Sequence, residues 1–485
     1  MNIEFSNVLA VAKADCDNDT LAYKHVRRVL KTMTPGAKFM KAHKLYLKDI
    51  AFLKKNPQIK RKVNGWDGKV DVISPSGEFN TGLLPVVLNT LWRETKTLPR
   101  LIDKRFNPYP RLQSTSMDLR YYQSEGVNAG LTNKFQNLYW PRGIFQLATG
   151  AGKTELAVAM YETTGYLPTL FIVHLKTLAW QAKERFEKYG YTVGRVFDGV
   201  IAPKSDGITI ATIQTLMRNT ADPQIEALLS NTQQVFFDEA HQIAAKSSGG
   251  NWFVKCSDYM PKAFYRWGLT ATPFMKDEYS NILLQGATGN VLKEVKTATL
   301  IKEGYLVDAN IKIIEVKKVT CPEKWPDCYD MGVTLNPIRT KLTAEEAVIL
   351  PKPLFVLTTQ VAHAKILERA LTAKGVKTKL LIGEDSQAVR QKALDDLSNK
   401  KLEAIVCTTI FDQGFDYTQL KSIIVAGGGK SVINTIQRLG RGLRNSKGKK
   451  TLQFRDFMDL SSKTLKRQSN ERIEIYKQQG FKVIT

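Results

Sequence analysis

The sequence predicts an α/β protein in which two tandem blocks, each a parallel sheet covered by helices, follow a small basic α+β region. Two observations predict this fold. Short apolar runs alternate with helical patterns from residue 119 to about residue 307, and the same alternation resumes at residue 354. Such alternation is typical of parallel sheets with helices on both faces. The composition, 43% hydrophobic and 24% charged, is that of a folded chain, and 485 residues suffice for about three domains.

The expected strands are the apolar runs themselves. In the first block they are residues 143–148, 169–173, 208–211 and 235–237, and in the second 354–357, 379–382, 404–408 and 422–426. We therefore expect domains at 1–110, 111–306 and 307–485. Between the two blocks an irregular segment is expected to be a linker or an insertion, because it contains Pro322, Trp325, Pro326, Asn336 and Pro337.

The net charge of +25 points to a polyanionic partner. The excess is concentrated near both ends of the chain. Residues 20–62 contain 13 Lys or Arg and one acid, Asp49, and the 45 residues from Arg441 onward contain 12 basic and 4 acidic side chains. Taken alone, either cluster is explained equally well as a solvated face.

The five cysteines are scattered, odd in number and without metal-ligand spacing, so we expect free thiols in a reducing compartment and no zinc site. The apolar stretch at 8–11 is too short for a secretory signal. No apolar run reaches the roughly 18 residues that span a bilayer. We expect a soluble, cytoplasmic monomer that does not act at a membrane.

A phosphate-binding motif is the first functional signal. Residues 143–154 read GIFQLATGAGKT, which predicts a strand, a turn and a helix that continues through 155–160. Gly150 and Gly152 let the backbone curl around phosphate oxygens. Lys153 is placed to reach the β- and γ-phosphates, and the Thr154 hydroxyl to bind Mg²⁺. Leu147 replaces the first glycine of the full pattern, and a Gly-Lys-Thr triplet is also common at helix starts.

Two adjacent carboxylates follow downstream. Residues 235–241 read VFFDEAH, an apolar strand that ends in Asp238 and Glu239. At the carboxyl end of a parallel strand, Asp238 can hold a metal ion and Glu239 can take a proton from an attacking water. The alternative is a strand that runs into an acidic, solvated turn. The P-loop upstream makes that alternative improbable.

This pair of motifs resembles the superfamily 2 helicases, and further motifs follow in the order of that family. Residues 119–123 (LRYYQ) look like the adenine-reading motif, and residues 268–273 (GLTATP) look like the motif that couples hydrolysis to domain movement. The resemblance implies that Gln123 contacts the base and that Thr270 and Thr272 are the coupling residues. Residues 171–181 and 208–215 look like strand-tracking motifs. They imply that the DNA-contacting residues of the first block are Lys176, Thr212, Gln214 and Thr215.

The second block continues the resemblance. Residues 404–416 look like the fifth motif, with Thr408 facing the nucleic acid and Gly414 and Asp416 the nucleotide. Residues 437–444 (QRLGRGLR) look like the sixth, which implies that Arg441 and Arg444 are arginine fingers. The positions of Gln437, Arg441 and Arg444 are i, i+4 and i+7, one face of a helix. The alternative is a phosphate-binding surface patch.

The resemblance implies two RecA-like domains that use ATP and Mg²⁺. Its catalytic residues would be Lys153, Asp238, Glu239, Gln437, Arg441 and Arg444. Its nucleotide-binding residues would be Gln123, Thr149, Gly150, Ala151, Gly152, Lys153, Thr154, Gly414 and Asp416, with Thr154 and Asp238 holding the metal.

Departures from two related groups narrow the assignment. His241 stands where DEAD-box RNA helicases have Asp, and the coupling motif begins with Thr270 in place of Ser. DEAH-type RNA helicases continue with long domains after the sixth motif, whereas about 40 residues follow it here.

The N-terminal region resembles that of phage UvsW-like helicases, which remodel branched DNA. The resemblance rests on residues 65–70 (GWDGKV) and 81–85 (TGLLP), and on a basic ending that includes Arg472 and Tyr476. It implies that this region binds DNA phosphates through side chains such as Lys69. Trp66 is equally well explained as a base-stacking residue or as a core aromatic beside an Asp-Gly turn.

The expected function is therefore that of an ATP-dependent DNA helicase that unwinds or branch-migrates forks, four-way junctions and RNA–DNA loops in replication, recombination or repair. Its expected partner is branched or forked DNA, with RNA–DNA hybrid as a second substrate. A phage origin would follow from the same resemblance. Two rivals need the same nucleotide site: a translocase that tracks duplex DNA without separating strands, and a nucleic-acid-binding protein switched by ATP.

Overall fold

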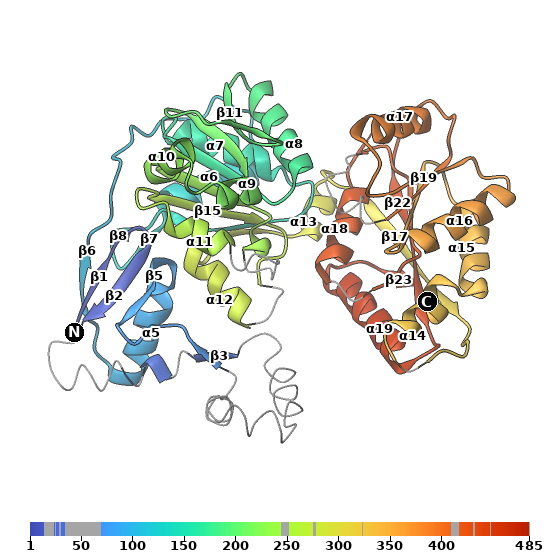
Figure 1. The fold of residues 1–485 in the computed structure, drawn as a ribbon, viewed down its shortest axis with the longest axis horizontal. Helices are drawn as coiled ribbons and strands as arrows, with labels where there is room; N and C mark the ends of the chain where they lie inside the picture. Colours follow the sequence, from blue (N-terminus) through green and yellow to red (C-terminus); the bar gives the residue numbers. More distant parts are fainter. Residues whose placement is uncertain are drawn as a thin grey trace. The chain divides into compact units, whose positions relative to one another are not determined.

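The computed structural model describes residues 1–13, 24, 26–28, 31–33, 69–243, 252–274, 278–322, 324–408, 417–429, 432–446 and 448–484. These residues form two compact units (Figure 1). Unit 1 comprises residues 1–146 and 153–294, and unit 2 comprises residues 147–152 and 295–485. The finer three-domain division expected from the sequence stays a prediction.

Unit 1 contains an eight-stranded sheet in the order β12-β11-β13-β10-β14-β15-β9-β16. The strands are β9 (Arg142–Leu147), β10 (Thr169–Val173), β11 (Val193–Phe197), β12 (Val200–Ala202), β13 (Ile208–Thr212), β14 (Gln234–Asp238), β15 (Tyr265–Thr270) and β16 (Val291–Val295). The six strands from β11 to β9 are parallel, and β12 runs antiparallel to β11. Their carboxyl ends therefore meet at one edge.

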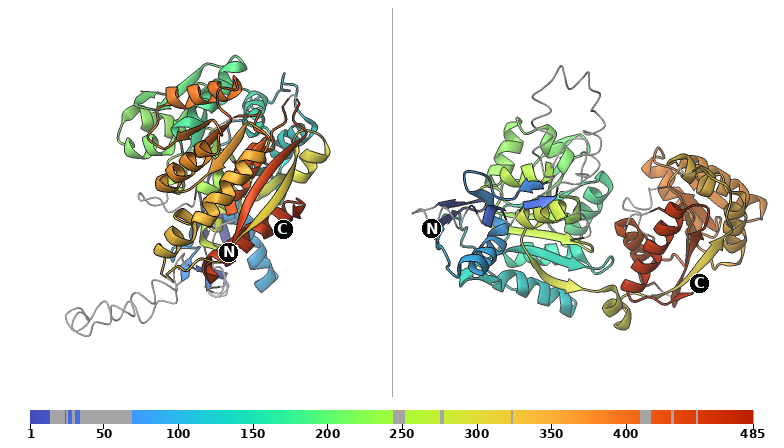
Figure 2. Two further views of the ribbon diagram at one scale, coloured as in Figure 1. Left: turned by 90° about the vertical axis from the view of Figure 1, so that its right-hand side faces the viewer. Right: turned by 90° about the horizontal axis from the view of Figure 1, so that it is seen from below.

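Helices cover both faces of this sheet (Figure 2). The helices that pack together on one face are α6 (Tyr121–Thr132), α7 (Lys153–Thr163) and α8 (Lys176–Lys188). Those on the other face are α9 (Ile213–Arg218), α11 (Trp252–Asp258) and α12 (Glu278–Ala287). Helix α10 (Pro223–Asn231) lies beside β12. Successive strand residues serve opposite faces. Val235 and Phe237 join the cluster that includes α9 and α11 residues. The Phe236 ring packs against Phe171 in a tilted arrangement, and Phe171 contacts Phe186 of α8 edge to face.

A smaller sheet near the N-terminus has the order β5-β2-β1-β6. Its strands are β1 (Asn2–Phe5), β2 (Leu9–Lys13), β5 (Glu78–Asn80) and β6 (Arg100–Asp103), and it packs with α5 (Leu84–Thr95). The short pairs β3 (Lys31–Met33) with β4 (Lys69–Asp71) and β7 (Lys134–Phe135) with β8 (Leu138–Tyr139) complete the unit. This mixture confirms an α+β N-terminal part, although most of the basic cluster at 20–62 lies outside the described residues.

Unit 2 contains a seven-stranded sheet in the order β19-β20-β18-β21-β22-β17-β23, with every pair parallel. The strands are β17 (Asp308–Val316), β18 (Leu354–Leu357), β19 (Thr378–Leu381), β20 (Ala404–Cys407), β21 (Ser422–Val425), β22 (Thr451–Asp459) and β23 (Val483–Ile484). All eight strands expected from the apolar runs are therefore confirmed, and with them the two parallel-sheet domains.

The helices of unit 2 are α13 (Thr297–Lys302), α14 (Asp327–Tyr329), α15 (Pro337–Ile349), α16 (Val361–Ala373), α17 (Gln387–Ser398), α18 (Val432–Gly442) and α19 (Lys463–Gln478). The π-helical turn η3 (Asp330–Thr334) follows α14. The segment expected to be an irregular linker or insertion is instead helical at 327–334 and from Pro337 onward. Asn336 caps α15 through hydrogen bonds from Ile338 and Arg339, and Pro337 occupies its first turn.

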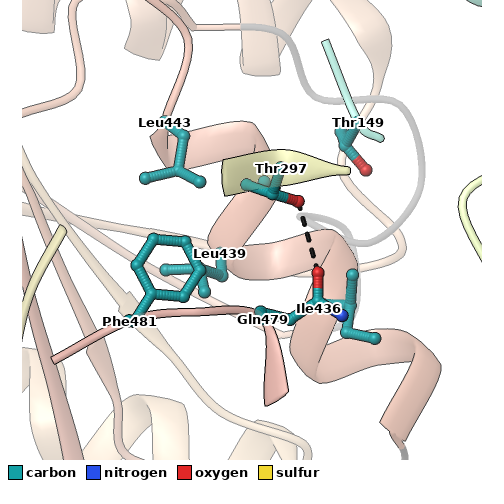
Figure 3. Close-up of a pocket in the computed structure, with 8 residues that line it drawn as sticks. Thr149, Thr297, Ile436, Leu439, Leu443, Gln479 and Phe481 are labelled. Carbon is teal, nitrogen blue, oxygen red and sulfur yellow. Dashed lines mark hydrogen bonds between the residues drawn. The ribbon is translucent and has the colours of Figure 1, made fainter. Parts of the chain in front are cut away.

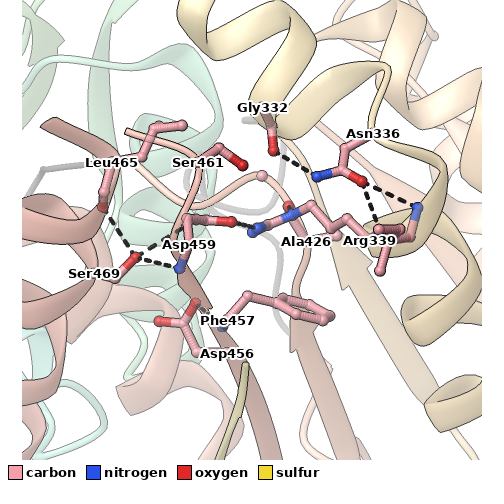
Figure 4. Close-up of polar contacts among 12 residues, drawn as sticks. Gly332, Asn336, Arg339, Ala426, Asp456, Phe457, Asp459, Ser461, Leu465 and Ser469 are labelled. Carbon is pink, nitrogen blue, oxygen red and sulfur yellow. Dashed lines mark hydrogen bonds and ion pairs between the residues drawn. The ribbon is translucent and has the colours of Figure 1, made fainter. Parts of the chain in front are cut away.

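Two buried arginines join the helices of unit 2 to β22. Arg339 forms an ion pair with Asp459 and donates to the Ala426 carbonyl at 2.7 Å (Figure 4). Arg472 of α19 pairs with Asp456 at 2.8 Å, and Tyr476 donates to the same carboxylate. A buried ion pair is costly to break, because the remaining partner stays desolvated without a counter-charge.

We expect Arg472→Ala to lower the free energy of unfolding by about 3–5 kcal/mol, because Asp456 would stay buried without its cation. Urea denaturation followed by circular dichroism measures this change. The matched control is Arg467→Ala on the same helix, which breaks the exposed pair with Glu471 and should cost less than about 1 kcal/mol. Equal losses from the two variants would contradict the assigned role of Arg472.

No helix in the described part of the chain is long and apolar enough to cross a membrane.

Candidate active site

The P-loop motif forms the strand, turn and helix expected from the sequence. β9 ends at Leu147 and α7 begins at Lys153. Gly150 and Gly152 have φ angles of +87° and +80°, which a side chain would strain. The turn therefore presents backbone N–H groups at a helix N-terminus, which is a favourable place for phosphate.

The turn itself, residues 147–152, belongs to unit 2. Gly440 of α18 lies so close to it that an added Cβ would come within 2.6 Å of the Thr149 Cβ. Gly150 lies beside Leu306 and the Arg444 side chain. The flank of this turn and α18 also line a small pocket (Figure 3), with Thr149, Thr297, Ile436, Leu439, Gly440, Leu443, Gln479 and Phe481 around it. Its lining consists of apolar and uncharged polar residues.

Asp238 and Glu239 stand at the carboxyl end of β14, where the sequence places them. Glu239 adopts a left-handed conformation with φ +47°, and its amide donates to an Asp238 oxygen at 2.9 Å. The Lys153 ammonium lies 3.7 Å from a Glu239 oxygen. Three of the predicted catalytic residues are thus brought together within unit 1. A lysine, two carboxylates and the adjacent Thr154 hydroxyl are a donor set that fits a Mg²⁺-bound triphosphate.

His241 connects the acidic motif with the coupling motif. It is buried, and its Nδ1 lies 2.9 Å from the Thr270 hydroxyl and 3.4 Å from a Glu239 oxygen. The Thr270 hydroxyl in turn accepts a hydrogen bond from the Thr272 amide at 3.1 Å. Sequence reasoning used His241 only to tell families apart and assigned it no role. Its place three residues after Asp238 was the available signal.

The environment of Asp238 disfavours its negative charge. Burial raises the pKa of Asp238 to about 7, the neighbouring Glu239 charge adds to the rise, and the Lys153 ammonium offsets part of it. The raised pKa means that the folded protein holds a proton on this carboxyl below about pH 7. A divalent cation competes with that proton, because only the carboxylate binds the metal.

We therefore expect the apparent Mg²⁺ affinity of the nucleotide-bound protein to rise with pH and to level off above about pH 7. Below that pH it should fall by up to about tenfold per unit. Mg²⁺ titrations with a non-hydrolysable ATP analogue, corrected for the titration of the nucleotide itself, measure this dependence. Asp258→Asn, which removes another partly buried carboxyl of unit 1, should keep the same profile. An affinity that does not change with pH would remove Asp238 from the metal site.

Gln123, the predicted adenine-reading residue, is buried in the first turn of α6. Its side-chain oxygen accepts a hydrogen bond from the Arg120 backbone amide at 3.0 Å. This capping contact holds the side chain at the helix start. Its role towards a base stays a prediction.

The four predicted strand contacts of unit 1 gather at the carboxyl ends of the neighbouring strands β10 and β13. Thr212 and Thr215 share a hydrogen bond of 2.8 Å, and the Gln214 amide donates to the His174 carbonyl at 2.9 Å. Lys176, mostly exposed, begins α8 and pairs with Asp198 at 3.0 Å. A polar surface thus follows the same sheet edge as the carboxylates.

The structure describes only some of the remaining predicted site residues. Thr408 follows β20 and is buried. Arg441 lies in the last turn of α18, but Arg444 lies beyond its end at Gly442 and bridges to Leu306. The prediction that Gln437, Arg441 and Arg444 share one helix is therefore wrong for Arg444, because the helix stops at a glycine. The described residues do not include Trp66, Gly414, Asp416, or the side chains of Lys69 and Gln437.

Two family models match the chain and divide it as the motifs do. Residues 116–275 match the res subunit of type III restriction enzymes, and residues 350–446 match the helicase conserved C-terminal domain. These matches contain the P-loop, the acidic and coupling motifs, and the arginine motif. The chain belongs to superfamily 2 of the helicases. The resemblance stated from the sequence is confirmed. Members of this family use ATP, typically with Mg²⁺.

Relatives with curated names are about a quarter identical to this helicase-family chain over the aligned residues. A DNA 3'-5' translocase, XPB2 of Sulfurisphaera tokodaii, is 25% identical over 70% of this chain and 81% of its own. The ATP-dependent DNA helicase uvsW of Enterobacteria phage T4 is 24% identical over 70% of this chain and 68% of its own. A protein named as a helicase in Sulfolobus islandicus filamentous virus is 23% identical over 70% of this chain. The match spans 64% of that relative's length.

Solved structures share the fold at lower identity. A fragment of an HsdR-type subunit of a type I restriction enzyme from Vibrio vulnificus has a TM-score of 0.55, with 19% identity over 71% of this chain and 64% of that one. The Type ISP restriction-modification enzyme LlaBIII bound to DNA has a TM-score of 0.58, with 14% identity over 82% of this chain and 36% of that one. These likenesses support the pair of parallel-sheet domains.

Proposed function

We propose that this protein is an ATP-dependent DNA helicase that unwinds or branch-migrates branched DNA, including forks, four-way junctions and RNA–DNA loops. The observation that carries the proposal is the connected set Lys153, Glu239, His241 and Thr270 within unit 1. It links a phosphate-binding lysine to the segment after β15 through short polar contacts. A motor needs such a link, because hydrolysis at one place must alter grip at another.

The proposed hydrolysis transfers the γ-phosphoryl group of ATP to water. As the water oxygen bonds to the γ-phosphorus, the bond to the β-phosphate oxygen breaks, and the Glu239 carboxylate accepts the proton of the water. Lys153 balances the negative charge of the phosphate oxygens. Mg²⁺, held by Thr154 and Asp238, would supply further charge neutralisation. Arg441 and Arg444 would stabilise the charge that develops on the transferred group.

Coupling to movement would pass through His241. When Glu239 gains a proton, the electrostatic environment of the His241 ring changes, and with it the ring's hydrogen bond to Thr270. Grip on the strand would come from Lys176, Thr212, Gln214 and Thr215 in unit 1 and Thr408 in unit 2. Such contacts with phosphate and sugar are independent of base sequence, which suits a stepping enzyme.

DNA as the substrate is supported by the names of two relatives, a phage DNA helicase and an archaeal DNA translocase. The phage relative also supports a phage origin. Roles in recombination and repair are part of the proposal through the resemblance to UvsW-like helicases. The archaeal relative favours a second candidate function, a translocase that moves along duplex DNA without releasing a strand.

We expect Arg441→Ala to retain ATP binding and to lose most turnover, by a factor on the order of 10³, because the finger acts on the developing charge. Nucleotide binding by equilibrium titration and kcat from phosphate release measure the two effects separately. Lys477→Ala, which removes an exposed pair with Glu474 on α19, is the control. Wild-type turnover in the Arg441 variant would remove the finger assignment.

Strand release from three substrates tests the branch-specific function: a four-way DNA junction, a forked duplex and an RNA duplex, with Lys153→Ala as the inactive control. Because the motor requires Lys153 for phosphate binding, release in that variant should be abolished. Preferential resolution of the junction supports branch migration. Equal release from fork and junction contradicts branch specificity, and ATP turnover without release favours the translocase.

A further inference from the structure

Residues 321, 322 and 324–335, which we name the inserted segment, lie outside all the motifs. They contain α14 and η3 and connect β17 with α15. Figure 1 shows α14 beside α19 in unit 2. The sequence indicated a linker or an insertion here and did not identify its role, so that role has to be inferred from its contacts.

The inserted segment is bound to the carboxyl edge of the unit 2 sheet. The Tyr329 hydroxyl donates to the Gly427 carbonyl and accepts from Thr359. The Gln360 side chain accepts from Thr334 at 2.9 Å and donates to Asp330 at 2.8 Å. Thr359 and Gln360 directly follow β18, and Gly427 follows β21. The segment is therefore hydrogen-bonded to the loops that follow β18 and β21, two central strands of the sheet.

Its inner side also packs on the start of α19. Cys328, Tyr329 and Val333 form one apolar cluster with Leu465. Gly332 lies so near Leu465 that an added Cβ would come within 2.6 Å of that side chain, and Figure 4 shows the two residues on facing elements. Fixed on both sides, the segment is a rigid support and not a loose connection.

Three large apolar side chains of the inserted segment are exposed. The side chains of Trp325, Met331 and Leu335 are 47%, 48% and 59% exposed. Three large exposed apolar side chains within one short, fixed segment make it a candidate binding surface. Exposed basic residues adjoin the segment at the end of β17, within the segment and at the start of α19: Lys317, Lys318, Lys324, Lys463, Lys466 and Arg467. Among the described residues there, the exposed acids are Glu315 near the end of β17 and Asp327 in the segment. Asp330 and Glu471 are partly buried, and Glu471 is paired with Arg467.

We propose that the inserted segment binds an unpaired stretch of DNA, with Trp325 stacking on a base and the surrounding lysines contacting phosphates. This inference rests on the proposed function and specifies how unit 2 holds the strand. An exposed aromatic ring amid cations matches the two surfaces of a single strand, its bases and its phosphates. The position agrees, because Leu357 pairs with Cys407 and so sets Thr358 beside Thr408, the predicted strand contact of unit 2.

Trp325→Ala in the full-length protein tests the proposal directly. We expect its affinity for a fluorescein-labelled oligo(dT) strand, measured by anisotropy, to fall roughly 5- to 150-fold, the range for loss of one base–aromatic stack. Affinity for a blunt duplex should change much less, since its bases are not free to stack. Trp325→Phe should restore most of the binding. The matched control is Trp92→Ala, which removes a tryptophan of similar exposure, 50%, from α5 of unit 1.

The proposed phosphate contacts of the lysines are tested separately, by the salt dependence of DNA affinity. Lys463→Ala combined with Lys466→Ala should reduce the slope of log affinity against log salt by about 1.4, as expected for two single-strand phosphate contacts. An unchanged slope would contradict the phosphate contacts.

Two failures are distinguishable in this design. If oligo(dT) neither binds the wild-type protein nor stimulates its ATP turnover, the proposed function fails, and the inference fails with it. If the wild type binds and responds but Trp325→Ala behaves like Trp92→Ala, the inference alone is overturned. In that case the exposed surface belongs to another partner, such as a protein.

Discussion

Parallel strand pairing is the constraint on which the site depends. In unit 1, β9, β15 and β14 are neighbours in register, so that Thr270 faces Gln146 and Asp238 faces Leu269. Parallel neighbours end at the same edge, and each motif occupies the few residues after such an end. Residues separated by more than a hundred positions in the chain thereby become adjacent, and a slip of one residue would turn these side chains to the opposite face.

The charges at this edge are mutually dependent. Glu239 is held in a left-handed conformation that a non-glycine residue adopts only at a cost, of order 1–3 kcal/mol. That conformation turns its carboxylate towards both Lys153 and His241. Its charge also helps to keep Asp238 protonated near neutral pH. In the proposed function, a bound cation would offset the repulsion between the two adjacent carboxylates, so that binding of Mg²⁺ and nucleotide would stabilise this edge of the sheet.

Much of this could be predicted from the sequence, for specific reasons. Buried parallel strands are continuous apolar runs, so β10, β14, β18 and β21 were visible without a structure. Contacts between distant residues were not. Counting charges placed Arg472 among the basic residues near the end of the chain, whereas it is buried against Asp456. The Cys321 and Cys328 sulfurs lie 3.6 Å apart, although the cysteines looked scattered along the chain. The start of α15 carried a readable Asn-Pro signal that the surrounding prolines obscured.

The strand order of unit 2 has a consequence for how the protein is made. β17 is the first strand of this sheet to leave the ribosome, yet its two neighbours are β22 and β23, the last ones. At about 5–20 residues per second, translation reaches β22 roughly 7–27 s after it completes β17. Until then a nine-residue strand has both edges unpaired. The nascent chain therefore offers chaperones a binding segment during synthesis, and a message truncated before β22 would yield a product prone to aggregate.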